Sequence, residues 1–161
     1  MADIIQLLPA IAIVGSTAVA AAMANKAIKS QCKTARTKAT LDLIINNQES
    51  RYHEELYAEF KSVRNSDGLE SLLVNGHSSV AKSRAKVQDF LNYYESICIG
   101  FDKDILDERF YKDYWGSTFV QHWNDSEKLI KEVQITSPKA YINFEKYAKS
   151  WESGCLVTKH D

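Results

Sequence analysis

The chain has 161 residues, 25% of them charged, and a formal net charge of −1, a length that supports one small globular core. From Ala39 onward it carries 15 basic and 20 acidic residues, which argues against a nucleic-acid partner. Its cysteines, at positions 32, 98 and 155, are widely spaced and odd in number. They favour reduced thiols over a disulfide framework or a metal site, and we expect no metal and no cofactor.

The first element is Ile4–Ala24, a stretch without any charged residue. A helix of this length reaches roughly 30 Å, the thickness of the hydrocarbon layer of a bilayer. We therefore predict a transmembrane anchor over residues 1–25. The alternatives are a cleaved signal peptide, for which a basic amino-terminal region is missing, and a buried helix of a soluble domain, which would need partners on every side.

Basic residues follow the uncharged stretch directly and define the predicted orientation. No Lys or Arg precedes the stretch, whereas Lys26, Lys29, Lys33, Arg36 and Lys38 come before the next acidic residue. Positive flanks stay inside, so we expect a single-pass protein of the inner membrane with its amino terminus outside and its larger domain in the cytoplasm. The basic residues, over 26–38, are predicted to contact the lipid bilayer surface; the alternative is that they only set the topology. Acylation of Cys32 is an open alternative to a plain thiol.

Small residues recur every four positions in the uncharged stretch, at Ala12, Ser16, Ala20 and Ala24. Such a row lets two helices approach closely in a bilayer. We expect it to mediate association into a homo-oligomer, although an alanine-rich segment also gives this spacing by chance.

Helical periodicity continues to the end of the chain. It predicts one helix over 41–63, a stop at 65–68, a short piece with three leucines, and a helix over 79–100. Asp107 is expected to cap a helix that bends near Gly116, and Ser137 is expected to cap the last helix, which Gly154 ends. The predicted fold is all-α: a transmembrane helix followed by an antiparallel bundle of about four helices over 39–154, with a tail over 155–161. The residues expected in the core are Leu41, Ile45, Tyr52, Leu56, Phe60, Val63, Val80, Val87, Phe90, Leu91, Tyr94, Ile97, Phe101, Phe110, Tyr114, Phe119, Trp123, Ile130, Val133, Tyr141, Phe144, Tyr147, Ala148 and Trp151.

Four segments carry a resemblance to a known family: 39–42 (ATLD), 90–95 (FLNYYE), 119–123 (FVQHW) and 138–144 (PKAYINF). Together, over roughly residues 35–151, they resemble a bacterial family of domains of unknown function, whose members look like small single-pass membrane proteins with a cytosolic helical domain. The resemblance implies the same topology and fold. It implies no activity, substrate or catalytic residue.

Three ionisable residues in or near these segments are the candidates for a ligand site: Glu95, Arg109 and His122. His122 stands between aromatic residues without a second histidine or thiol at ligand spacing, so a structural role is the main alternative. Glu95 is expected to be half-buried and to pair with Arg109 across a helix junction. The sequence contains no glycine-rich phosphate loop and no nucleophile elbow, so we predict no catalytic residues and do not favour an enzyme.

These observations lead to two functional hypotheses. The first is a membrane-tethered helical interaction or scaffold module, which associates with itself or binds a protein partner at the inner face of the membrane. The second is a small-ligand sensor or hydrolase with a polar site around Glu95, Arg109 and His122. Convergence of those three residues on one cavity would favour the second.

Overall fold

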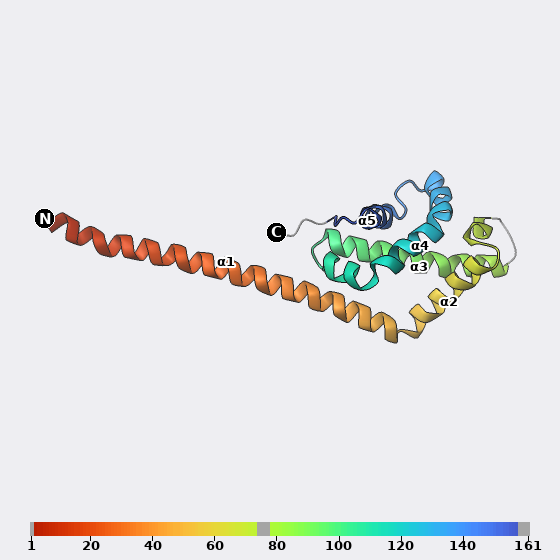
Figure 1. Ribbon diagram of the computed structural model, residues 1–161, viewed down its shortest axis with the longest axis horizontal. Coiled ribbons are helices and arrows are strands. Elements are labelled where there is room, and N and C mark those ends of the chain that lie inside the picture. The colour runs from red at the N-terminus through yellow and green to blue at the C-terminus, as the bar shows by residue number, and fades with distance from the viewer. Residues whose placement is uncertain (1, 74–77, 158–161) are drawn as a thin grey trace. The chain divides into compact units, whose positions relative to one another are not determined.

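The computed structural model describes residues 2–73 and 78–157, with side chains from residue 19 onward. These residues form five α-helices and one short 3-10 helix (Figure 1), so the all-helical prediction is confirmed. The elements are α1 (Ala2–Glu49), α2 (Arg51–Asn65), η1 (Leu69–Leu73), α3 (Ser78–Asp102), α4 (Glu108–Thr136) and α5 (Ile142–Glu152).

The chain divides into two units, Met1–Arg36 and Thr37–Asp161. The first consists of the amino-terminal part of α1. The second is a helical bundle built from the end of α1 and all later elements. The sequence placed the corresponding boundary between residues 38 and 39, two residues further on.

The structure contradicts the predicted transmembrane helix. Within the part of the chain that it describes, no helix is long and apolar enough to cross a membrane. The prediction of a single-pass inner-membrane protein is therefore wrong as well. In the described part of α1 the uncharged run ends at Asn25 and Lys26, Lys29 and Lys33 follow within two turns; each such charge costs about 3 kcal/mol at a bilayer centre. The side chains of residues 1–18, which make up most of the predicted anchor, lie outside the described residues.

A break at Ser50 separates α1 from α2, where the sequence predicts one continuous helix. Ser50 has an extended backbone (φ −80°, ψ 108°), and its hydroxyl accepts a hydrogen bond from the backbone N–H of His53 at 3.3 Å. Serine is a preferred helix cap because this oxygen replaces a missing helical partner. The break turns a different row of α1 toward the bundle: Thr40 and Ile44 are buried, whereas Leu41 and Ile45 are exposed.

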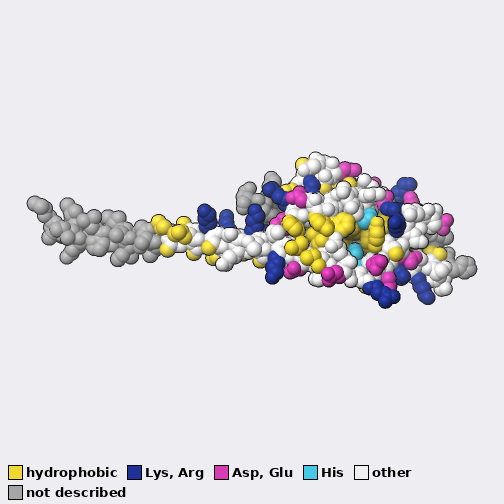
Figure 2. Space-filling model, turned by 60° about the horizontal axis from the view of Figure 1, so that its bottom comes forward, with side chains coloured by type: hydrophobic (Ala, Val, Ile, Leu, Met, Phe, Trp, Pro, Cys, Tyr) yellow, Lys and Arg dark blue, Asp and Glu magenta, His cyan; other side chains and the backbone are white. Residues whose placement is uncertain are grey.

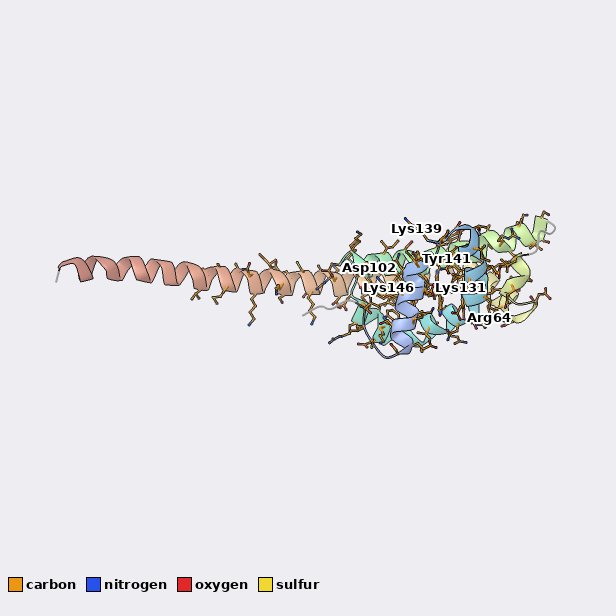
Figure 3. The ribbon with its side chains drawn as sticks, turned by 90° about the horizontal axis from the view of Figure 1, so that it is seen from above. Arg64, Asp102, Lys131, Lys139, Tyr141 and Lys146 are labelled. Carbon is orange, nitrogen blue, oxygen red and sulfur yellow. The ribbon has the colours of Figure 1, made fainter. Side chains whose placement is uncertain are left out.

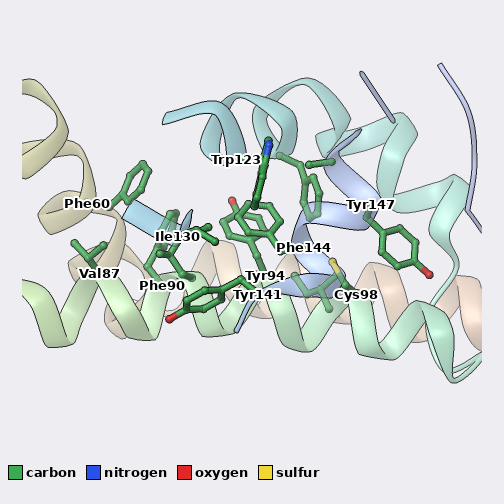
Figure 4. Packing of buried hydrophobic residues seen from close by; sticks show 14 of the residues in the cluster. Phe60, Val87, Phe90, Tyr94, Cys98, Trp123, Ile130, Tyr141, Phe144 and Tyr147 are labelled. Carbon is green, nitrogen blue, oxygen red and sulfur yellow. The ribbon is translucent and has the colours of Figure 1, made fainter. Parts of the chain in front are cut away.

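Aromatic side chains from α3, α4 and α5 form the centre of the core (Figure 4). Tyr94 of α3 stacks on Phe144 of α5 with ring centroids 5.0 Å apart, and Trp123 of α4 meets Phe144 edge-on at 5.5 Å. In Figure 1 α5 is seen end-on while α3 runs across the view, so α5 crosses α3 steeply. Most predicted core residues are buried, but Tyr52 and Tyr114 are exposed, by 61% and 54%.

The start of α4 is fixed as the sequence predicts. The Asp107 carboxylate accepts a hydrogen bond from the backbone N–H of Phe110 at 3.0 Å. Its other oxygen accepts from the Thr37 hydroxyl at 2.7 Å, and the Asp107 N–H donates to the Thr40 hydroxyl at 2.8 Å. One residue thus caps α4 and ties it to α1. α4, which was expected to bend near Gly116, continues without interruption to Thr136.

Candidate functional site

Glu95 is a helix cap supplied by a neighbouring helix. Its carboxylate accepts hydrogen bonds from the backbone N–H of Phe144 at 2.8 Å and of Asn143 at 3.3 Å, and from the Asn143 side-chain amide at 2.7 Å. These N–H groups lie in the first turn of α5, where a helix has no internal partners for its donors. Tyr141, at the cap position of α5, makes no side-chain capping bond. Glu95 on α3 therefore replaces the local cap.

The three predicted ligand residues do not converge in the structure. Arg109 is exposed in the first turn of α4, Glu95 contacts the start of α5, and His122 is buried in the middle of α4. Glu95 was expected to pair with Arg109. In the described part of the chain its carboxylate instead accepts hydrogen bonds from the backbone of α5. Ligand binding by these residues remains a prediction, but they do not form one site.

His122 forms a hydrogen-bonded pair with Tyr94. Its Nδ1 lies 2.7 Å from the Tyr94 hydroxyl, and its side chain is only 4% exposed. Phe60 and Phe90 surround the imidazole, with ring centroids 5.2 and 5.4 Å away. Burial lowers the pKa of His122 to about 4, because an apolar environment disfavours the charged form. The imidazole is therefore neutral at neutral pH.

The charge state of this pair follows from the two pKa shifts. Burial raises the pKa of the Tyr94 hydroxyl, so this hydrogen bond joins two neutral groups, and the tautomer of the imidazole decides which of them donates. A general base works best with a pKa near the working pH. His122, with its lowered pKa and its Nδ1 bonded to Tyr94, has a structural role here.

The surface beside this pair is rich in aromatic groups. His53 lies 4.7 Å from Tyr93 between ring centroids, and Tyr57 lies 5.6 Å from His122. The Tyr93 hydroxyl accepts a hydrogen bond from the side-chain amide of Asn47. Figure 2 shows hydrophobic side chains gathered on this face of the bundle next to histidine side chains. Burial lowers the pKa of His53 as well.

A buried carboxylate that the sequence analysis did not single out is Glu108. Its side chain is fully buried, and one oxygen accepts from the Trp151 indole N–H at 2.8 Å and from the Val157 backbone N–H at 2.7 Å. Glu108 thus holds the segment after α5 against the start of α4. The only sequence signal for Glu108 is its position next to a helix cap. Its partners cannot be inferred locally, because they are 43 and 49 residues away in the chain.

Acidic and basic side chains on the bundle surface also hold helices together. Asp102 at the end of α3 binds Lys146 of α5 at 2.7 Å (Figure 3) and accepts from the Tyr147 hydroxyl at 2.7 Å. Glu145 pairs with Lys131 and Lys149, both at 2.6 Å, and these bonds, which outweigh its partial burial, lower its pKa to about 2. These groups join α5 to α3 and α4.

The described side chains of the first unit, in contrast to those of the bundle core, are mostly exposed. Every side chain from Val19 to Ala35 is exposed, including Val19 at 60%, Met23 at 69% and Ile28 at 56%. Of the predicted association row, Ala20 and Ala24 are exposed, while Ala12 and Ser16 lie outside the residues whose side chains are described. The predicted lipid-contacting residues Lys26, Lys29, Lys33 and Lys38 are exposed and Arg36 is half-buried; their role remains a prediction.

Comparison with known proteins identifies a family. Residues 10–151 match the model of a family described as "Domain of unknown function (DUF4760)". The prediction of a family of unknown function is confirmed, whereas the match does not confirm the FLNYYE and FVQHW segments as its motifs or a membrane character. No curated protein and no solved structure matches the chain.

Proposed function

Since the chain belongs to the DUF4760 family, whose description names no activity, we propose its function from its own geometry: it is a helical interaction module that associates with a second copy of itself through α1. The observation that carries the proposal is that every side chain from residue 19 to residue 35 of α1 is exposed. Its larger apolar side chains, such as Met23 and Ile28, are 69% and 56% exposed, and helices in proteins gain most of their stability from packing of their apolar residues. A partner that covers its apolar residues would stabilise it.

The distribution of charge on α1 indicates which side the partner covers. Lys26, Lys29 and Lys33 recur at spacings of three and four, so they share one side of the helix. The opposite side carries an uncharged row made up of Ala20, Ala24, Ile28, Gln31 and Ala35. Two copies that meet along the uncharged row bury apolar side chains and keep the ammonium groups in water. Small side chains in the row permit close approach of the helices.

The bundle supports an interaction role over an enzymatic one. Glu95, Glu108 and His122, its three most unusual polar groups, each hold another part of the fold. Within the described residues no buried side-chain nitrogen or oxygen lacks a hydrogen-bond partner. Catalytic groups generally stand ready to bind a substrate atom, and these groups are engaged with the protein itself.

The test is the mass of the full chain in solution, measured by sedimentation velocity over a range of concentrations. The disruptive variant is Ala20→Glu with Ala24→Glu, on the uncharged row. The matched control is Ala22→Glu with Asn25→Glu, which adds the same two charges on the basic side. All four positions are exposed, so none of the changes disturbs packing within the chain.

We expect the parent and the control pair to sediment as the same dimer or higher oligomer, and the Ala20/Ala24 pair to sediment as a monomer. Like charges brought together on an interface repel and are costly to bury. A monomeric parent at tens of micromolar would refute self-association. Equal behaviour of the two pairs would refute the uncharged row as the interface.

A further inference from the structure

A cleft in the bundle lies between η1 and α3 on one side and the end of α4 on the other. Its volume is about 290 Å³, near the lower end of the range for small-molecule sites. It is lined by Leu72 and Leu91 on one side and by Leu129 and Val133 on the other. The three leucines are buried, so the inner surface of the cleft is apolar.

The charged group beside the cleft is used by the fold. Among the described residues that line the cleft, Arg84 alone is charged. Its Nε donates a hydrogen bond to the backbone carbonyl of Leu72 at 2.7 Å, which ties α3 to η1. We therefore assign Arg84 a structural role and no part in ligand binding.

The Tyr141 hydroxyl is a polar group of the cleft that the described part of the chain leaves without a hydrogen bond. Tyr141 lines the cleft and is only 8% exposed. Among the described residues no enclosed side-chain oxygen lacks a partner, so this hydroxyl must be open to water. Figure 4 shows it pointing away from Phe144 and toward the Val87 side of α3 (compare Figure 3). The cleft thus combines apolar walls with one available hydroxyl.

The surroundings of Tyr141 define what this hydroxyl can bind. Its backbone is strained, with φ at +56° in the left-handed region, a feature that the fold must hold in place and that is common at ligand sites. Burial, with the nearby charges of Glu95 and Asp89, raises the pKa of the hydroxyl, so it remains a neutral donor. The same negative charges disfavour an anionic group beside it.

We propose that this cleft binds a small uncharged aliphatic molecule that carries one hydrogen-bond acceptor, such as a straight-chain ketone. The Tyr141 hydroxyl donates to the carbonyl oxygen of the ligand, and the chain lies between Leu91, Leu129 and Val133. A ligand without an acceptor would displace water from the hydroxyl and leave it unpaired, which is costly. The small volume excludes a bulky ligand. This site lies within the bundle and does not rest on the proposed self-association through α1.

The experiment is a titration of the full chain with 2-heptanone, followed by methyl NMR of Leu91, Leu129 and Val133. We expect saturable shifts confined to the methyl groups of the cleft. Each methylene that the cleft accepts should tighten binding about fourfold, so 2-butanone should bind far more weakly. Heptanoate has the same number of carbons but a charged end. It should bind about tenfold or more weakly than 2-heptanone, because a carboxylate loses more hydration on entering an apolar cleft.

Tyr141→Phe removes the hydroxyl alone and should weaken the binding of 2-heptanone about fivefold. The control Tyr114→Phe, at an exposed tyrosine of α4 outside the cleft, should leave binding unchanged. Val133→Phe, on the opposite side of the cleft, should block the chain of the ligand. Shifts scattered over the surface, equally tight binding of heptanoate, or unchanged binding by Tyr141→Phe would each overturn the proposal. The methyl spectrum of each unliganded variant shows directly that it is folded.

Discussion

The burial of His122 predicts a loss of stability in mild acid that one substitution removes. Its pKa is 6.5 in the unfolded chain and about 4 in the folded protein, so the unfolded state binds the proton more readily. Above about pH 6.5 the free energy of unfolding is not reduced by His122. It decreases as the pH is lowered from about 6.5 to about 4. Between about pH 7.5 and pH 5 the expected loss from this residue is about 2 kcal/mol.

The measurement is urea unfolding of the parent and of His122→Gln, followed by tryptophan fluorescence at both pH values and constant ionic strength. Glutamine can donate to or accept from the Tyr94 hydroxyl and does not titrate. The parent should lose about 2 kcal/mol more than the variant between the two pH values. His53 and the carboxylates are present in both proteins, so the difference isolates His122. Equal losses would refute the assignment of a buried neutral imidazole.

Three further substitutions test the packing. Trp123→Ala removes a side chain that is 1% exposed and should cost about 3 to 5 kcal/mol in urea unfolding; a melting temperature within a degree or two of the parent would contradict this. Glu95→Ala leaves the first turn of α5 without its acceptor and should cost about 2 kcal/mol, with faster amide exchange at Phe144 as the specific sign. Gly100→Ala would place a Cβ 2.6 Å from Leu106 Cδ1 and should cost about 1 to 3 kcal/mol; Leu106→Ala in the same chain should recover part of that loss, and an additive double mutant would contradict the clash.

Sequence periodicity predicts the core of the later helices well because each helix keeps one phase from end to end. It fails for α1 because the predicted row of Leu41 and Ile45 extends the phase of Leu56 and Phe60 backward through Ser50. The serine interrupts the helix, and the phase changes there. A capping residue inside a periodic run was the available signal, but serine is also common on exposed helix faces.

The start of α5 could not be predicted from local signals. Ser137 and Pro138 have the preferred order for a helix start, yet Ser137 ends α4 and α5 begins at Ile142. The deciding groups are the Glu95 carboxylate, 48 residues earlier in the chain, and the strained backbone of Tyr141. For the same reason the structure does not bring Glu95, Arg109 and His122 together: Glu95 and His122 are each used by a different tertiary contact, and Arg109 is exposed. The predicted anchor rested on length and lack of charge, properties that the described part of α1 does not sustain beyond Asn25.

The cap that Glu95 provides also bears on how the domain folds. α5 has 11 residues, which is too short to persist alone in water, and its first turn is completed only when α3 is already in position. A peptide spanning 137–157 should therefore be largely unstructured, and α5 should form late, by docking onto α3. During synthesis the aromatic core could therefore close only after residues 142–152 have been made.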